Sequence, residues 1–303
     1  MLYIIAGATA SGKTAVAIAL AHKIKGEIIN ADSMQIYRGM NIGTAKPDMA
    51  EREGIPHHLL DIVNPDEPFS VALYQKMAQE KIREIQGRGS VPILVGGTGF
   101  YINAVVYNTD FSPQNEDDTP LRNQYLHMAT EKGASYIHDL LAARDPQAAR
   151  EIHSSNIKRV ARALAFVETT GALFSSHNAA QKEKKLLPLP SDIHFFILDM
   201  PREKLYERIN RRTEIMLNAG LEEEVAGLLQ KGYSPDLPAM QAIGYKEILA
   251  QTPKEILAQT IAQNTRHYAK RQLTWFRNST PHARWINADD SAENIAEIMQ
   301  RKI

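Results

Sequence analysis

The sequence predicts an α/β fold, a doubly wound parallel sheet that a helical insertion domain interrupts. Three observations lead to this prediction. Apolar, strand-like runs alternate with helical patterns over residues 1–110. A polar, proline-bounded segment at 111–120 follows, and residues 121–178 then have a helical pattern without a convincing strand. The apolar run 193–198 returns the chain to the sheet, and helical patterns fill most of 201–303.

The domain boundaries follow from this change of character. At 303 residues the chain is longer than one typical domain and can bury a substantial core. We expect a catalytic α/β domain made of residues 1–112 and 191–303, with C-terminal helices. Residues 113–190 are expected to form the helical insertion domain.

A glycine-bearing motif follows the first predicted strand. The eight residues GATASGKT at 7–14 match the pattern GxxxxGK[ST] at every fixed position. The two glycines let backbone N–H groups surround an anion, and the lysine adds a mobile positive charge. The helix predicted at 15–24 adds the positive end of its dipole. The sequence therefore predicts a phosphate-binding loop (P-loop), formed by Gly7, Ala8, Thr9, Ala10, Ser11, Gly12, Lys13 and Thr14.

The rest of the chain lacks the sequence pattern of a P-loop ATPase. Such enzymes carry a second strand that ends in an acid for magnesium. The strand predicted at 91–95 instead ends in the glycine-rich residues 96–99. The run 193–198 does end in Asp199, but Pro201 follows at once, so opening a helix is the better interpretation of that acid.

Asp32 follows the second predicted strand. In a doubly wound sheet, ligands bind beyond the carboxyl ends of the strands, so Asp32 could approach an acceptor beside the phosphates. A carboxylate there can take a proton from an attacking amine or hydroxyl as general base. From position alone, a cap of a turn or helix is an equally good interpretation.

The adjacent His57 and His58 could suggest a metal site. The chain has no cysteine, and neither histidine has a helical partner four residues away. We therefore expect these two side chains to pack or to form hydrogen bonds.

Composition restricts the class of protein. An apolar content of 44% is typical of a globular protein, and no apolar run approaches the roughly 20 residues of a membrane span. No signal-peptide pattern precedes the first strand, and the lack of cysteine excludes a disulfide framework and a thiolate metal site. We expect a cytoplasmic protein that has no membrane partner.

Charge is balanced over the whole chain but not locally. The 35 Lys and Arg residues equal the 35 Asp and Glu residues, which is not the basicity expected of a nucleic-acid binder. Residues 256–288 nevertheless contain no acid and interleave aromatic side chains with cations, namely Arg266, Tyr268, Lys270, Arg271, Trp275, Phe276, Arg277, Arg284 and Trp285. Such a segment is either an amphipathic helix with a solvated basic face or a contact to RNA phosphates.

Five blocks of the sequence, in order, resemble one known family. They are GATASGKT at 7–14, NADSMQIYRGMNIGTAKP at 30–47, HHLLDIVNPDEPFSV at 57–71, PILVGGTGFYINAV at 92–105 and AKRQLTWFR at 269–277. Together they resemble the bacterial tRNA dimethylallyltransferases, the MiaA-type tRNA isopentenyltransferases, over nearly the whole chain.

The resemblance implies an activity and a set of catalytic residues. A dimethylallyl group would pass from dimethylallyl diphosphate to the exocyclic amine of the adenosine on the 3′ side of the anticodon. A diphosphate leaving group would explain a P-loop without the acid of an ATPase. Asp32 matches the general base, Thr14 the partner of the bridging oxygen, and Lys13 with Arg212 the clamp on the diphosphate. Mg²⁺ is the implied cofactor, and its direct ligands stay open.

The same resemblance implies a contact surface for the anticodon stem-loop of tRNA. The target base would flip into a channel at a cost of roughly a few kcal/mol, the insertion domain would help enclose the stem-loop, and the enzyme would act as a monomer. The implied contacts are Asp32, Ser33, Met34, Gln35, Thr98, Arg122, Lys158, Arg159, Arg162, Gln241, Gly244, Lys246, Lys270, Arg271, Trp275 and Arg277.

Other functions remain open at this point. One is prenylation of free AMP or ATP, and another is a P-loop small-molecule kinase in which Asp32 deprotonates an acceptor hydroxyl. Without the resemblance, the insertion would also suit a lid over a small-molecule site. The large insertion and the basic segment 256–288 favour tRNA as acceptor, and the later sequence blocks count against a kinase. A non-catalytic RNA-binding module would need neither Lys13 nor Asp32.

Overall fold

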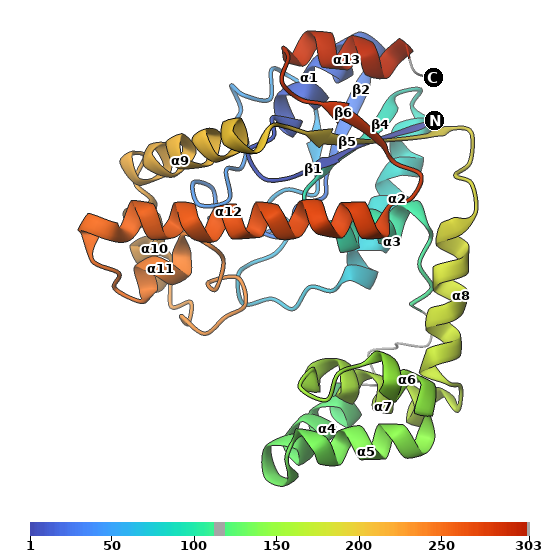
Figure 1. Ribbon diagram of the computed structural model, residues 1–303. Coiled ribbons are helices and arrows are strands. Elements are labelled where there is room, and N and C mark those ends of the chain that lie inside the picture. The colour runs from blue at the N-terminus through green and yellow to red at the C-terminus, as the bar shows by residue number, and fades with distance from the viewer. Residues whose placement is uncertain (112–118, 302–303) are drawn as a thin grey trace. The chain divides into compact units, whose positions relative to one another are not determined.

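The computed structural model describes residues 1–111 and 119–301 (Figure 1). The chain divides into two compact units, one made of Met1–Val106 with Leu189–Ile303 and the other of Tyr107–Pro188. The predicted domain boundary at residue 113 lies outside the described residues.

A six-stranded parallel sheet forms the centre of the first unit, within the part of the chain that is described. Its spatial order is β3-β2-β4-β1-β5-β6. The strands are β1 (Leu2–Gly7), β2 (Gly26–Asn30), β3 (His57–His58), β4 (Val91–Gly96), β5 (Ile193–Asp199) and β6 (Arg284–Asn287). This arrangement confirms the predicted parallel α/β sheet. The short edge strands β3 and β6 are not among the strands that the sequence predicts.

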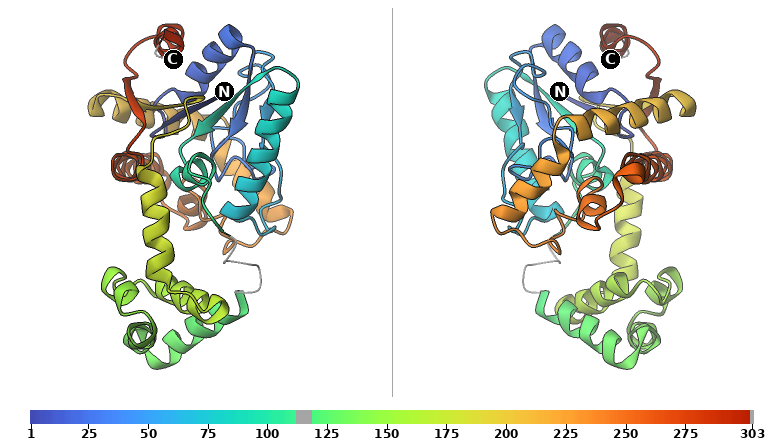
Figure 2. Two further views of the ribbon diagram at one scale, coloured as in Figure 1. Left: turned by 90° about the vertical axis from the view of Figure 1, so that its right-hand side faces the viewer. Right: turned by 90° about the vertical axis from the view of Figure 1, so that its left-hand side faces the viewer.

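Helices lie on both faces of this sheet (Figures 1 and 2). One face carries α1 (Lys13–Ile24) and α13 (Ala292–Arg301), and the other carries α2 (Val71–Gly87), α3 (Gly99–Val106) and α12 (Lys254–Ser279). Helix α9 (Arg202–Asn218) packs along α12, and α10 (Leu221–Gln230) and α11 (Tyr245–Leu249) follow it in the chain.

Burial of β1 and α1 fixes the loop between them. All six residues of β1 are buried, as a central strand of a parallel sheet requires. Helix α1 buries a row of small and branched side chains, among them Val16 and Leu20, in the core that α13 shares. Only a short loop joins these two elements, so both of its ends are held in place.

The second unit consists of helices in its described residues. They are α4 (Thr119–Lys132), α5 (Ala134–Arg144), α6 (Pro146–Glu151), α7 (Ile157–Thr170) and α8 (Phe174–Leu186). Asp145 is fully buried and accepts hydrogen bonds from the backbone N–H of Ala148 at 3.0 Å and of Ser175 at 2.8 Å. This carboxylate therefore ties the start of α6 to α8, while Lys158 and Arg159 of α7 stay exposed.

Candidate active site

Two adjoining cavities lie at the carboxyl ends of β1, β2 and β4. The first, here called the Lys13 cavity, has a volume of about 400 Å³ and is lined by Lys13, Thr14 and their neighbours. The second, here called the Ser33 cavity, has a volume of about 350 Å³. Four residues line both of them: Thr9, Asp32, Thr44 and Arg212. Asp32 thus lies on the wall between two separate binding spaces.

The loop after β1 has the backbone that its glycines predict. Gly12 has a φ of +88°, and a Cβ at Gly7 would lie only 2.8 Å from the carbonyl oxygen of Leu198. The Nζ of Lys13 donates to the carbonyl of Ala8 at 2.6 Å, so the ammonium folds back over its own loop. Burial lowers the pKa of Lys13 to about 8, while the carboxylate of Asp32 opposes this shift and Arg212 adds to it. An anion in this cavity would favour the charged form of the lysine and so raise its pKa.

Helices α9 and α12 hold the same loop from outside. Arg212 of α9 donates to the Oγ1 of Thr9. Gln272 of α12 accepts from the backbone N–H of Thr9 at 2.8 Å and donates to the carbonyl of Gly97 at 3.0 Å. One amide therefore connects the loop after β1 to the loop after β4. Burial lowers the pKa of Arg212, and the nearby Asp32 opposes the shift.

Two further arginines reach the Lys13 cavity that the sequence analysis did not single out. Arg208 and Arg211 of α9 line it together with Arg212. Their spacing of three and four residues is the signal that could have found them, because such positions share one face of a helix. Together with Lys13, they make this cavity strongly cationic.

Asp32 forms the turn cap that its position predicts, and its role as general base stays a prediction. Its Oδ1 accepts a hydrogen bond from the backbone N–H of Met34 at 2.8 Å, as a turn cap does. Its own N–H donates to the Oδ1 of Asn30 at 3.0 Å, which fixes the start of the turn. In the described part of the structure its Oδ2 has no hydrogen-bond partner, and the residue lines both cavities. One oxygen is thus held while the other is left for a ligand.

The glycine-rich residues after β4 serve close packing. A Cβ at Gly96 would lie 2.1 Å from the carbonyl oxygen of Ala31, and one at Gly97 would lie 2.3 Å from the Nε2 of Gln272. This approach lets Thr98 accept from the backbone N–H of Ser33 at 2.9 Å and donate to its Oγ. The end of β4 thereby supports the turn that carries Asp32.

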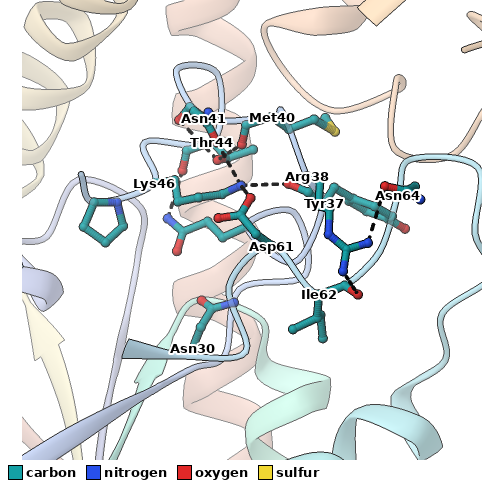
Figure 3. A network of polar contacts seen from close by, with 12 residues as sticks. Asn30, Tyr37, Arg38, Met40, Asn41, Thr44, Lys46, Asp61, Ile62 and Asn64 are labelled. Carbon is teal, nitrogen blue, oxygen red and sulfur yellow. Dashed lines mark hydrogen bonds and ion pairs between the residues drawn. The ribbon is translucent and has the colours of Figure 1, made fainter. Parts of the chain in front are cut away.

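A buried lysine organises the loop that carries Thr44 (Figure 3). The side chain of Lys46 is 3% exposed, and its Nζ contacts the carbonyl of Tyr37 at 2.7 Å, the Oδ1 of Asn41 at 3.0 Å and the Oδ1 of Asp61 at 2.5 Å. Burial lowers the pKa of Lys46, and the bond to Asp61 opposes that shift. The network fixes the chain on which Thr44 reaches both cavities.

Glu224 of α10 binds backbone N–H groups of the same loop. Its carboxylate accepts from the N–H groups of Asn41 and Ile42 at 2.8 Å and of Gly43 at 3.1 Å. It also accepts from the hydroxyl of Tyr245 at 2.6 Å, and burial raises the pKa of that phenol so that it stays a donor. The sequence analysis missed this residue, because its three backbone partners lie more than 180 positions away.

The structure brings together most of the residues expected to contact tRNA. Gln35 lines the Lys13 cavity. Thr98 and Trp275 line a smaller hollow described below. Lys270 is exposed on α12, and Arg277 pairs with Asp199 at 3.6 Å. The Ser33 cavity is lined by Ser33, Met34, Gln241, Gly244, Lys246 and Arg271.

Four of the expected contacts belong to the second unit, which is described by itself. They are Arg122, Lys158, Arg159 and Arg162. The latter three share the first half of α7.

Two side interpretations can be judged from local contacts. His57 bonds through Nδ1 to the carbonyl of Ile55 at 2.8 Å, and His58 bonds through Nε2 to Glu27 at 2.7 Å. These two hydrogen bonds confirm the hydrogen-bonding interpretation. The helix-opening interpretation of Asp199 is wrong. Pro201 precedes α9 without a side-chain cap bond, and the Asp199 carboxylate instead pairs with Arg277.

Comparison with known proteins decides the family. Residues 35–279 match the family model described as IPP transferase, and residues 1–64 match that of isopentenyl transferase. The tRNA dimethylallyltransferase of Acetivibrio thermocellus is 46% identical over 303 residues, which cover 98% of this chain and 95% of the relative. This chain belongs to the tRNA dimethylallyltransferase family. It is thus a prenyltransferase, and the family resemblance of its five sequence blocks is confirmed.

Solved structures agree with this family. The tRNA isopentenylpyrophosphate transferase of Bacillus halodurans is 40% identical, with a TM-score of 0.72 over 99% of this chain and 95% of the other. A eukaryotic dimethylallyltransferase acting on tRNA is 30% identical, with a TM-score of 0.84 over 100% of this chain and 77% of the other. Membership in this family favours the prenyltransferase interpretation over a small-molecule kinase.

Proposed function

We propose that the protein transfers a dimethylallyl group from dimethylallyl diphosphate to the exocyclic amine of the adenosine on the 3′ side of the anticodon in tRNA. One observation carries this proposal: Asp32 lies between a cationic cavity and a second, separate cavity. A transferase for two large substrates needs its base at the boundary between them.

The Lys13 cavity is the proposed donor site, built as a P-loop. The diphosphate binds the backbone N–H groups of the loop, Lys13 and Arg212, and the hydroxyl of Thr14 reaches the oxygen that bridges the prenyl group and the diphosphate. Arg208 and Arg211 add positive charge at the rim. An allylic diphosphate ionises more easily when the charge on its leaving oxygens is stabilised, which is where most of the rate gain arises.

Mg²⁺ fits this site as a cofactor. The exposed hydroxyl of Thr14 lines the cavity, and Mg²⁺ binds one or two protein groups together with phosphate oxygens and water. A protein cluster of three ligands is therefore not needed. When bound, the ion would neutralise charge on the diphosphate.

The Ser33 cavity is the proposed acceptor site. The target adenine leaves its stack and enters the cavity, at a cost of roughly a few kcal/mol that contacts with the cavity offset. The amine nitrogen attacks C1 of the donor, the C1–O bond breaks, and the diphosphate leaves with the electron pair. The free Oδ2 of Asp32 takes the proton from the nitrogen.

The remaining tRNA contacts supply affinity and register. Lys270 and Arg271 of α12 meet phosphates of the anticodon stem-loop, and the basic side of α7 meets them elsewhere. We propose that the enzyme acts as a cytoplasmic monomer. Within the described ranges, no helix is both long enough and apolar enough to cross a membrane.

The test is incubation with labelled dimethylallyl diphosphate and unmodified tRNA, beside AMP and ATP as competing acceptors. We expect label in tRNA, at the adenosine next to the anticodon, and little label in AMP or ATP. Label that accumulates mainly in AMP or ATP would replace this function by prenylation of free nucleotides.

A further inference from the structure

A third hollow adjoins the Ser33 cavity. It has a volume of about 190 Å³, less than the roughly 300–1,000 Å³ typical of a pocket for a whole small molecule. Tyr268 and Arg271 line both this hollow and the Ser33 cavity, so the two spaces adjoin. It is therefore suited to one part of a ligand whose other part occupies the Ser33 cavity.

The hollow is built around Phe100, the second residue of α3. This side chain is 70% exposed, although it is large and apolar. Its ring centroid lies 5.7 Å from that of Trp275, with the two planes tilted by 47°. A Cβ at Gly99 would lie 2.1 Å from the Trp275 ring, so the glycine lets the indole pack directly against the start of α3. Phe100 thus presents a supported aromatic surface to solvent.

Charge around the hollow favours a polyanion. The guanidinium of Arg271 lies 5.7 Å from the ring centroid of Tyr268, and Lys270 precedes it on α12. The residues that line the hollow include no Asp or Glu. Aromatic faces beside arginine are how proteins bind unpaired bases of single-stranded RNA.

We propose that Phe100, backed by Trp275, is the stacking platform for a base next to the target adenosine in the acceptor RNA. The inference rests on the proposed function and deepens it. When the target base enters the Ser33 cavity, its neighbour in the strand loses a stacking partner, and the Phe100 ring replaces that partner. A free nucleotide has no such neighbour, so the platform selects RNA over AMP.

The first test compares Phe100→Ala with Phe100→Trp, using an anticodon stem-loop RNA as acceptor. Loss of base stacking should raise KM for the RNA about 5- to 100-fold and leave kcat within about twofold. Phe100→Trp should keep KM close to that of the wild type. Met49→Ala is the matched control, because Met49 is an equally prominent apolar side chain at 76% exposure.

A second test reports stacking directly and is independent of turnover. We would place 2-aminopurine on the 5′ or the 3′ side of the target in two RNAs. Binding to the wild type should quench its fluorescence at one of the two positions, and Phe100→Ala should abolish that quenching. The position that responds identifies the stacked neighbour.

Three outcomes would overturn the platform. The first is a KM of Phe100→Ala for RNA within twofold of the wild type, and the second is an equal rise of this KM in Phe100→Trp. The third is dissociation of an oligomer in Phe100→Ala during sedimentation velocity, which would assign the ring to a protein contact. A failure of the proposed function itself is distinct, because the wild-type protein would then transfer no label to RNA.

Discussion

The Lys13 cavity and the Ser33 cavity share a wall but differ in chemistry. The first gathers four cations, Lys13, Arg208, Arg211 and Arg212, close to the glycine-bearing loop after β1. The second also has cations, Arg212, Lys246 and Arg271, but these lie among apolar side chains such as Met34, Met216 and Ile243. Dense charge suits a diphosphate, and a mixed lining suits the flat, uncharged ring of a base.

The two cavities also differ in what holds their shape. The Lys13 cavity rests on buried β1, on α1 and on the bridge from Gln272. The Ser33 cavity depends more on Glu224, which holds Gly43 in its lining, while Lys46 holds the part of the loop that borders both cavities. Substituting Glu224 should therefore disturb the acceptor side before the donor side.

Replacing Asp32, which lines both cavities, should have the largest effect on the rate of transfer and should leave tRNA binding nearly unchanged. Asp32→Asn keeps the cap to Met34 but removes the proton acceptor, so we expect single-turnover transfer to fall about 10²- to 10⁴-fold. The Kd for tRNA should stay near that of the wild type. Asp236→Asn, an exposed carboxylate, serves as the control. A rate within about threefold of the wild type would exclude Asp32 as the base.

Lys13→Met should affect binding of the donor and not binding of tRNA. Loss of a charged hydrogen-bond donor should weaken donor binding about 10- to 100-fold, with tRNA affinity nearly unchanged. Isothermal titration with each substrate alone measures both values. An equal loss of tRNA affinity would place Lys13 on the RNA instead.

The same lysine should give donor binding a pH dependence of defined sign. Since burial lowers the pKa of Lys13 to about 8, the ammonium is present below that pH and is lost as the pH rises through it. Donor affinity should be constant near pH 7 and fall from about pH 8 upward, and Lys13→Met should show a flatter profile. A wild-type profile that stays flat to pH 9.5 would contradict this expectation.

Neutralising Lys270 and Arg271 together should act on the acceptor side alone. Each lost phosphate contact should reduce the slope of log K against log salt by up to about one unit, while the preference for the target adenosine persists. The double variant Lys76→Ala/Arg83→Ala, which removes two exposed cations of α2, is the control. An unchanged slope would remove α12 from the RNA contact, and an equal loss of transfer to AMP would favour the small-acceptor function.

Glu224→Ala should have the smallest effect on chemistry and show how the Ser33 cavity is supported. Three backbone N–H groups and the hydroxyl of Tyr245 would lose their acceptor, at a cost of about 1–3 kcal/mol in the free energy of unfolding. Urea denaturation measures that loss. KM for RNA should rise more than KM for the donor, and Glu223→Ala beside it should leave both unchanged. A larger rise in KM for the donor than for RNA would refute the conclusion that Glu224 mainly supports the Ser33 cavity.

Local sequence signals predicted the parts of this molecule that depend on local structure. Strand β1, the loop after it and Asp32 could be placed because each follows from an apolar run and a short motif. The interactions that complete the site could not, because they join distant positions. Gln272 bonds Thr9 across 263 residues, and Glu224 bonds Asn41 across 183. The interpretation of Asp199 failed for the same reason, since its partner Arg277 comes from a helix far along the chain.

The glycines after β4 have a consequence for how this sequence can vary. Gly97 has no room for a methyl group beside Gln272, and Gly99 has none beside Trp275. Gly87, at the end of α2, has no atom within 4 Å of a Cβ placed there. In a saturation library under selection, positions 97 and 99 should keep glycine while position 87 drifts freely. Some glycines in such a motif are thus required because a neighbouring side chain occupies the space of a Cβ. In alignments of this family, such glycines should count as packing positions.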